Sequence, residues 1–194
     1  MTEAIKGHVL WLTGLSGAGK STIAIELIKL YQQRGIYPVQ LDGDKVRAAI
    51  SDPNWQFDIA SRLRGSYIYA RLAAMLSEQG HLVIVPTISM FHEVRQWNRD
   101  HISRYFEVYL KVSAQVRHQR DPKQLYQRYT DGQHAQMPGL DLAIEEPQHA
   151  DLVLLNEQGP DSISAISQHI FEQLNVRFPQ ILQRPQSAGG AHDQ

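Results

Sequence analysis

Apolar residues are concentrated in five short runs of strand length along the chain. The runs are His8–Thr13, Tyr37–Leu41, His81–Pro86, Phe106–Val112 and Asp151–Leu155. The third run is continuously apolar, which is typical of a parallel strand covered on both faces. We therefore predict five strands in one parallel sheet.

Stretches with apolar residues at helical spacing lie between or after these runs. We predict helices over Ser21–Arg34, Asp58–Gln79, Phe91–Tyr105, Ala114–Arg120 and Ser162–Asn175. Strands that alternate with helices form a parallel sheet with helices on both faces. The expected fold class is therefore α/β, with three layers and a doubly wound, parallel five-stranded sheet in a single domain over residues 1–182.

Two segments do not fit this alternation. The stretch Asp121–Pro147 is polar, rich in Gln and Tyr, and interrupted by Gly132, Pro138 and Gly139. An insert of this kind between two strands is suited to closing over a site, so we predict a mobile lid over about residues 119–149. Residues 183–194 are rich in Gly, Ser and Pro, and we predict a disordered tail there.

A glycine-rich turn follows the first run and precedes the first helix. Its sequence, Gly14–Ser21, matches the pattern G-x-x-x-x-G-K-[ST] of a phosphate loop, or P-loop. Backbone N–H groups of such a loop and the start of the following helix bind phosphate oxygens. Lys20 is expected to reach the β- and γ-phosphates, and Ser21 to bind Mg²⁺. We predict ATP and Mg²⁺ as cofactors in a P-loop hydrolase/kinase fold.

Composition excludes several other classes of protein. The chain has 19 Lys and Arg against 20 Asp and Glu, a net charge of −1, which argues against nucleic acid or a membrane as the main partner. It has no Cys, which excludes disulfides, thiolate metal sites and a cysteine nucleophile. None of its asparagines begins the N-K-x-D motif by which GTPases read guanine, and its nine histidines have no metal-site spacing. No targeting or membrane segment is visible, so we expect a cytoplasmic kinase that acts on a small molecule.

Two carboxylates follow the second run at the edge where open α/β sheets bind ligands. One of Asp42 and Asp44 is expected to orient Mg²⁺ or its waters, and the other to accept a proton from an acceptor hydroxyl. Arg47 follows as an anion clamp. The alternative is that Asp42 and Asp44 only cap the helix that contains Arg47.

Other aromatic and basic residues leave their roles open at this point. Trp55 and Phe57 either stack on a base or pack beneath a helix. His92 and Glu93 either contact substrate or occupy a surface helix. Candidates for an anion cluster are Arg62, Arg64 and Arg71, whereas we predict a solvated face for Arg95, Arg99 and Arg104.

These motifs together resemble the adenylylsulfate kinase family. The resemblance runs from about Val9 to Asn156 and rests on Gly14–Thr22, Leu41–Asp44 with Arg47, Thr87–Ser89 and Arg120–Tyr126. Enzymes of this family move the γ-phosphate of ATP to the 3′-hydroxyl of adenosine 5′-phosphosulfate (APS).

The resemblance implies a role for each matching residue. Catalytic roles fall to Asp44 and Lys20, and metal binding to Ser21 and Asp42. The implied ATP-binding residues are Gly14, Leu15, Ser16, Gly17, Ala18, Gly19, Lys20, Ser21, Thr22 and Arg120. The implied substrate-binding residues are Asp42, Arg47, Phe57, Arg62, Ile88, Ser89 and Lys123. Arg120 and Lys123 belong to the family's mobile lid.

The acceptor half departs from the family pattern. Where the family typically has Arg-x-x-Asn-x-Arg, this chain has Arg62-Leu-Arg-Gly65-Ser-Tyr67, and Ile-Ser-Pro is replaced by Ile88-Ser89-Met90. The stretch 88–109 looks closer to relatives found with capsule-sugar genes, one branch of which phosphorylates cytidine diphosphoramidate.

The sequence therefore predicts an ATP-dependent kinase that phosphorylates a ribose 3′-hydroxyl of a 5′-activated nucleotide, and we expect it to act as a homodimer. The alternative acceptor is cytidine diphosphoramidate. An alternative of another class is a non-catalytic ATP-binding module. A nucleic-acid end kinase is disfavoured by the near-zero net charge.

Overall fold

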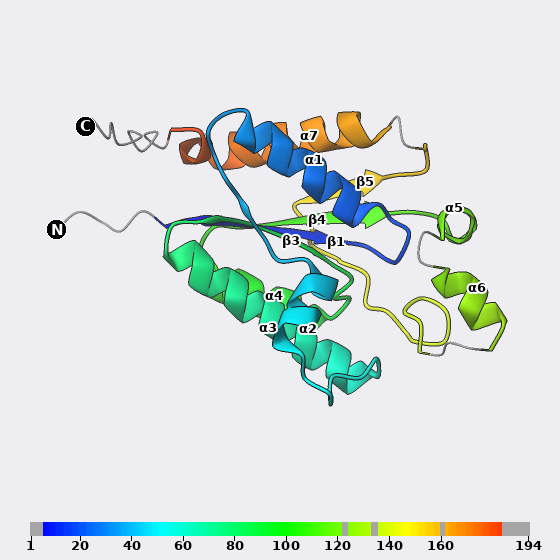
Figure 1. Cartoon of the computed structure of the whole chain (residues 1–194). Coiled ribbons are helices and arrows are strands. Elements are labelled where there is room, and N and C mark those ends of the chain that lie inside the picture. Colours follow the sequence, from blue (N-terminus) through cyan, green and yellow to red (C-terminus); the bar gives the residue numbers. More distant parts are fainter. Residues whose placement is uncertain (1–5, 122–123, 133–135, 160–161, 184–194) are drawn as a thin grey trace, which may run out of the picture.

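Five parallel strands form the centre of the molecule (Figure 1). The computed structural model describes residues 6–121, 124–132, 136–159 and 162–183. The strand order is β2-β3-β1-β4-β5. The strands are β1 (His8–Thr13), β2 (Val39–Gln40), β3 (Leu82–Thr87), β4 (Tyr105–Lys111) and β5 (Leu152–Leu155). All four neighbouring pairs are parallel, so the predicted α/β fold class is confirmed.

Helices cover both faces of this sheet (Figure 1). One face carries α1 (Lys20–Gln32) and α7 (Ser162–Arg177). The other carries α2 (Gly43–Ile50), α3 (Ile59–Glu78) and α4 (His92–His101). Two short helices, α5 (Ala114–Arg120) and α6 (Leu125–Thr130), lie at the end toward which the strands point, and a 3₁₀ turn (Pro179–Ile181) follows α7. Within the described residues, no helix has the length and hydrophobicity to cross a membrane.

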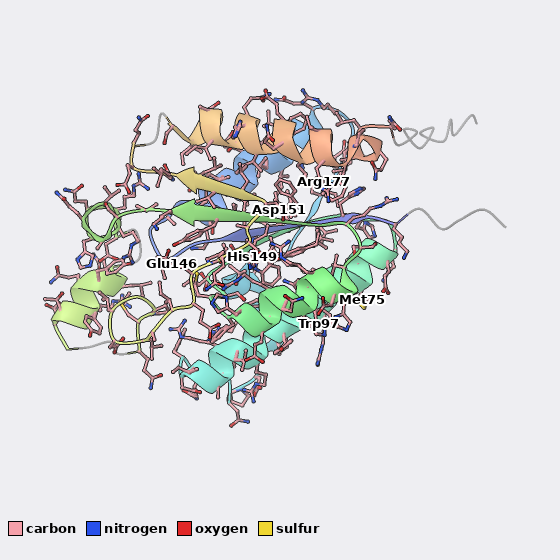
Figure 2. The ribbon with its side chains drawn as sticks, turned by 180° about the vertical axis from the view of Figure 1, so that it is seen from behind. Met75, Trp97, Glu146, His149, Asp151 and Arg177 are labelled. Atoms are coloured by element: carbon pink, nitrogen blue, oxygen red, sulfur yellow. The ribbon has the colours of Figure 1, made fainter. Side chains whose placement is uncertain are left out.

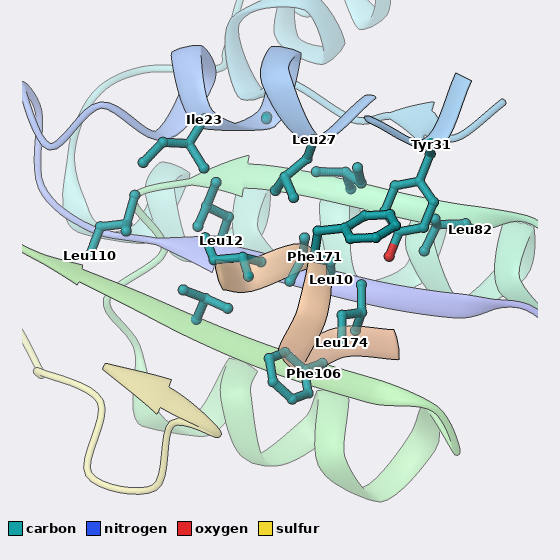
Figure 3. Close-up of a cluster of buried hydrophobic side chains, with 14 of the residues drawn as sticks. Leu10, Leu12, Ile23, Leu27, Tyr31, Leu82, Phe106, Leu110, Phe171 and Leu174 are labelled. Carbon is teal, nitrogen blue, oxygen red and sulfur yellow. The ribbon is translucent and has the colours of Figure 1, made fainter. Parts of the chain in front are cut away.

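Alternation along the buried strand β1 divides the core into two clusters. Leu10 and Leu12 face α1 and α7, where they meet Leu27 and Phe171 (Figure 3). Val9 and Trp11, on the opposite face, belong to the cluster under α3 and α4. Because consecutive side chains of a strand point to opposite faces, one continuous apolar run supplies both layers of packing.

Two predicted elements are shorter in the structure. Strand β2 has two residues instead of five, because Tyr37 is exposed and Pro38 has no N–H to donate to a ladder. Helix α4 ends at His101 rather than Tyr105, since Ile102 takes extended backbone angles and Tyr105 pairs with Val9 in the sheet.

Helix α6 was not predicted. Its first turn is fixed from outside the helix, because the two carboxylate oxygens of Asp121 accept the backbone N–H groups of Tyr126 and Gln127 at 3.2 and 3.0 Å. The predicted tail lies outside the described residues except for Gln183.

The strand order brings the chemically distinctive segments together. Because all five strands are parallel, their carboxyl ends meet at one edge of the sheet, where ligands bind in open α/β folds. The phosphate loop follows β1, Asp42 follows β2, Ile88 follows β3 and Asn156 follows β5. The candidate site is therefore assembled at this edge.

The first prediction concerns the core between α1 and the sheet. Leu27 is fully buried, so Leu27→Ala is expected to lower the free energy of unfolding by about 2–5 kcal/mol. Ile25 on the same helix is 48% exposed, and Ile25→Ala is expected to change it by about 0.5 kcal/mol or less. Urea denaturation of both variants measures the difference, and equal losses would contradict this placement of α1.

Candidate functional site

A large cavity opens at the carboxyl edge of the sheet. Its volume is about 1010 Å³, at the upper end of the range of pockets that bury one drug-sized ligand. The phosphate loop, the start of α2, the adjoining part of α3 and the segment after β3 all line it. Residues between Gln119 and Ile144 line it as well. Most of the sequence-predicted donor and acceptor residues thus share one cavity, whereas Gly14, Leu15 and Ala18 are not among its lining residues.

The phosphate loop takes a conformation that depends on glycine. Gly17 and Gly19 have φ angles of 80° and 88°, which other residues rarely adopt. Gly19 also approaches Asn156 so closely that a Cβ atom would lie 2.8 Å from its Nδ2 atom. Helix α1 begins directly after Gly19, so its N-terminal dipole faces the loop, as an anion site requires.

Side chains from later parts of the chain hold the loop from outside. Asn156 Nδ2 donates to the carbonyl of Ala18 at 3.0 Å, and the Tyr126 hydroxyl donates to the carbonyl of Ser16 at 3.1 Å. Lys20 Nζ donates to the carbonyl of Leu15 at 2.8 Å, which folds the lysine back over the loop.

One side-chain contact connects this loop to the carboxylates after β2. Ser21 Oγ donates to Asp42 Oδ2 at 3.2 Å. The other oxygen, Oδ1, accepts the backbone N–H groups of Asp44 and Lys45 at 3.1 and 3.4 Å. Asp42 is therefore the N-cap of α2 and a partner of the phosphate loop at the same time.

Asp44 lies in the first turn of α2, exposed and lining the cavity. The capping interpretation is thus correct for Asp42, and Asp44 lies beyond the cap. Asp42 and Asp44 are thus two carboxylates beside the phosphate loop that have different contacts. One is tied to Ser21 and to backbone, and the other faces the cavity.

Two arginines flank one aromatic ring deeper along the cavity wall. The guanidinium carbon of Arg47 lies 4.3 Å from the centre of the Phe57 ring, and that of Arg62 lies 5.6 Å from it. Burial, with the nearby charge of Arg47, lowers the pKa of Arg62. Phe57 is 49% exposed, so its ring is accessible beside two cations. This arrangement suits a planar, negatively charged ligand.

Of the other two arginines in the proposed cluster, Arg64 lies 3.8 Å from Asp52 and Arg71 lies over Tyr67. The structure therefore brings Arg62 together with Arg47, in place of the predicted cluster of three.

Trp55 packs against α3. It is 6% exposed and stacks on Tyr69 with ring centres 6.0 Å apart. A Cβ atom at Gly65 would lie 2.4 Å from its Cζ2 atom. The two aromatics left open by the sequence therefore have different environments, with Trp55 buried and Phe57 half exposed.

The segment after β3 is tied to the end of β1. Thr13 Oγ1 donates to the carbonyl of Ile88 at 2.6 Å, and both Ile88 and Ser89 line the cavity. Ser89 is buried, and its hydroxyl has no hydrogen-bond partner in the described part of the chain. A buried hydroxyl of this kind at a cavity wall is a candidate for contact with a ligand.

The prediction of a solvated face for Arg95 and Arg99 is wrong. Arg95 is 4% exposed and lies 3.5 Å from Glu107, which also pairs with Arg99 at 2.7 Å. Burial raises the pKa of Glu107, and the two guanidinium charges oppose that shift. Figure 2 views this side of the molecule and labels Asp151, which lies 3.4 Å from Arg99. The arginines neutralise a buried carboxylate of β4, a partnership that no local pattern reveals.

Part of the predicted lid contacts the phosphate loop. Arg120 donates to the carbonyls of Gly17 and Gln158, both at 3.4 Å, and Arg62 donates to the carbonyl of Gln136 at 3.0 Å. Lys123, which was predicted to bind substrate, lies outside the described residues.

Asn156 and Tyr126 were not predicted as site residues, although both hold the phosphate loop. A signal exists for Asn156, since it is a polar residue directly after a strand at the ligand-binding edge. Tyr126 ends the Arg120–Tyr126 motif on which the resemblance rests, but the motif assigned no role to it.

The chain is similar to known kinases over most of its length. The family model described as "Adenylylsulphate kinase" matches residues 6–155. A probable adenylyl-sulfate kinase of Pyrococcus abyssi is 36% identical over 76% of this chain and 84% of its own. A cytidine diphosphoramidate kinase of Campylobacter jejuni is 36% identical over 77% of this chain and 86% of its own. The structure of a Mycobacterium tuberculosis APS kinase in complex with AMPPNP and APS aligns with a TM-score of 0.81 at 32% identity, covering 88% of this chain and 98% of that one.

The second prediction separates the capping role of Asp42 from its contact with Ser21. Asp58 caps α3 through the N–H of Ser61 and provides a matched control. Asp42→Ala and Asp58→Ala are each expected to lower the free energy of unfolding by about 1 kcal/mol. Asp42→Asn keeps a capping side chain and is expected to cost less. Thermal unfolding measures all three, and a negligible cost for Asp42→Ala would contradict the cap.

Proposed function

Because this chain belongs to the adenylylsulphate kinase family, we propose that it transfers the γ-phosphate of ATP to the ribose 3′-hydroxyl of a 5′-activated nucleotide. The protein is an ATP-dependent phosphotransferase whose acceptor is a hydroxyl group. The observation that carries the proposal is the contact between Ser21 and Asp42, because it joins a phosphate site to a pair of carboxylates.

The phosphate loop holds the donor in this proposal. Backbone N–H groups of residues 14–22 and the N-terminus of α1 bind the phosphates, and Lys20 moves from its carbonyl partner to the β- and γ-phosphate oxygens. Arg120 adds positive charge beside Gly17. A phosphoryl transfer requires such charge around the oxygens that become more negative in the transition state.

Mg²⁺ fits the oxygen donors at the end of the loop. Ser21 Oγ and Asp42 Oδ2 lie 3.2 Å apart at the start of α1, and hydroxyl and carboxylate oxygens are the ligands that Mg²⁺ prefers. When bound, the ion neutralises charge on the donor phosphates. Asp42 Oδ1 keeps its backbone contacts in this arrangement, so α2 stays fixed.

Asp44 serves as the general base. It lines the cavity two residues after the residue that contacts Ser21, and this supports a position beside the donor phosphates. From there it accepts the proton of the acceptor hydroxyl as that oxygen attacks the γ-phosphorus atom. Lys20 stabilises the charge that develops on the transferred group.

The acceptor binds along Arg47, Phe57 and Arg62, with Ile88 and Ser89 on the facing wall. Phe57 supplies a stacking surface, and the two guanidinium groups supply charge for the acceptor's phosphate. Residues 119–149, with Arg120 and Lys123, act as a lid that excludes water from the γ-phosphate.

A second acceptor is supported by two departures from the family pattern on α3, of which Gly65 lines the cavity whereas Tyr67 is not among its lining residues. Gly65 and Tyr67 occupy the positions where the resemblance implies Asn and Arg, and one of the similar proteins is a cytidine diphosphoramidate kinase. Tyr67 donates to Glu93 at 3.1 Å, so its hydroxyl is engaged with α4. We therefore also propose cytidine diphosphoramidate as a substrate to be tested beside APS.

The third prediction tests the role of Asp44. Asp44→Asn is expected to lower kcat by about 10² or more, the scale of general-base loss, while the Kd for ATP changes by only a few-fold. Steady-state kinetics and calorimetric ATP titration measure the two effects. Asp100→Asn, at an exposed position of α4, is the matched control and is expected to retain activity. Unchanged turnover in Asp44→Asn would contradict its assignment as the base.

The fourth prediction concerns the acceptor. With ATP and Mg²⁺, APS and cytidine diphosphoramidate are expected to differ in kcat/KM by at least about tenfold, equal to about 1.4 kcal/mol of transition-state binding. ADP release, measured with each acceptor and without one, gives the comparison. If neither acceptor raises ADP release above the background rate, that result contradicts both proposed acceptors and favours the alternative of a non-catalytic ATP-binding module.

A further inference from the structure

We propose that Gly65 and Trp55 form a specificity element, in which Gly65 admits the indole ring and the docked indole positions Arg47 and Phe57 for the acceptor. The inference rests on the proposed function, because it concerns the same cavity. The two residues are positioning residues. The indole of Trp55 and the absence of a side chain at Gly65 together determine which acceptor the cavity wall accommodates.

Gly65 lies in the middle of α3, where only a residue without a side chain leaves room for Trp55. Gly65 is the only glycine between Ile59 and Glu78, and it lies seven residues into a helix where glycine is normally destabilising. Its φ angle is not positive, so the backbone does not require glycine. A Cβ atom there would lie 2.4 Å from Trp55 Cζ2 and 3.0 Å from Cε2. The absent side chain therefore makes room for the indole.

The docked indole holds the backbone segment of residues 55–57 in place. The carbonyls of Trp55 and Gln56 accept Arg47 Nη1 at 3.3 and 3.4 Å, and the next carbonyl, that of Phe57, accepts Arg62 Nε at 2.6 Å. Three consecutive carbonyls of this segment are thus bound to the two arginines of the acceptor wall. Displacement of the indole would move all three carbonyls and the guanidinium groups with them.

The indole also contacts the arginine directly. The Arg47 guanidinium carbon lies 5.0 Å from the Trp55 ring centre and 4.3 Å from the Phe57 ring centre. Tyr69 stacks on the Trp55 indole, and its hydroxyl donates a hydrogen bond to the carbonyl of Gly43 at 3.1 Å. The indole is therefore fixed from α3 and connected, through Tyr69, to the first turn of α2.

The acceptor wall combines aromatic surface with positive charge. Position 65 contributes no side chain to an acceptor, so no side-chain hydrogen bond comes from that position, and the Trp55 indole occupies the space beside it. Trp55 is nine-tenths buried, lines the cavity, and its Nε1 donor has no partner among the described residues. The class of acceptor that fits has a planar base to stack on Phe57 and an anionic group for Arg47 and Arg62.

The fifth prediction tests this element with Gly65→Ala, Trp55→Leu and the double variant. Gly65→Ala is expected to raise the Kd of the preferred acceptor, measured by calorimetry in the presence of AMPPNP, by about tenfold or more. A misplacement of about 1 Å is sufficient for an effect of that size. The Kd for AMPPNP alone is expected to change less than about twofold, because the phosphate loop is not touched.

The double variant distinguishes positioning from general damage. Alanine normally stabilises a helix relative to glycine, so Gly65→Ala is expected to lower Tm in the wild-type background and to raise it by a few degrees in the Trp55→Leu background. Trp97→Leu is the matched control. Trp97, labelled in Figure 2, packs against Tyr67 and His101 and is expected to affect Tm without changing acceptor affinity.

Two results would overturn the inference. One is an unchanged acceptor Kd in Gly65→Ala, and the other is an equal loss of affinity for AMPPNP and acceptor. Failure of the proposed function has a different signature, namely wild-type protein that shows no phosphoryl transfer to either acceptor. Acceptor affinities in the variants are measured without turnover, so they decide the inference in that case as well.

Discussion

The contact between Ser21 Oγ and Asp42 Oδ2, 3.2 Å long, connects two segments that their strands do not bring into direct contact. The phosphate loop follows β1 and the carboxylates follow β2, and β3 lies between these strands in the sheet. The same carboxylate caps α2 through the N–H groups of Asp44 and Lys45. The position of Asp44, and of Arg47 one turn later, therefore depends on a residue that also faces the phosphate loop. The side chain of Asp42 thus connects the phosphate loop to the backbone of the proposed base.

Arginines have two different roles in this protein, which the net charge of −1 does not reveal. Arg47, Arg62 and Arg120 line one cavity together with Lys20, and Asp42, Asp44 and Glu157 line it as well. In the proposed function these four cations bind the phosphates of the substrates. Arg95 and Arg99 neutralise Glu107 inside the protein, and Arg95 also donates to the carbonyls of Ser89 and Glu145. The second group thus supports the segment that lines the acceptor side. Planar donor groups serve both purposes, which explains the preference for arginine over lysine at these positions.

Patterns in the sequence were sufficient for the architecture and insufficient for the partnerships between distant residues. Continuous apolar runs located β1 and β3 because burial on both faces leaves a strong local signal. The start of α6 was missed because its first turn is held by Asp121, and the end of α4 because Tyr105 pairs with Val9. Likewise, the burial of Arg95 depends on Glu107 in the neighbouring strand β4, and the environment of Trp55 depends on an absent side chain at Gly65. Apart from the contact of Asp121 with Tyr126, which is five residues away, these features depend on which residues the fold brings together.

In the proposed mechanism, one cavity brings a donor phosphate and an acceptor hydroxyl together at Asp44. The most direct measurement is a crystal structure of the protein with a non-hydrolysable ATP analogue, Mg²⁺ and the preferred acceptor. We expect phosphates in the loop of residues 14–22, the acceptor base on Phe57, and a ribose hydroxyl within about 3 Å of an Asp44 oxygen and facing the γ-phosphate. An acceptor hydroxyl directed away from Asp44, or a cavity that holds only one nucleotide at a time, would contradict it.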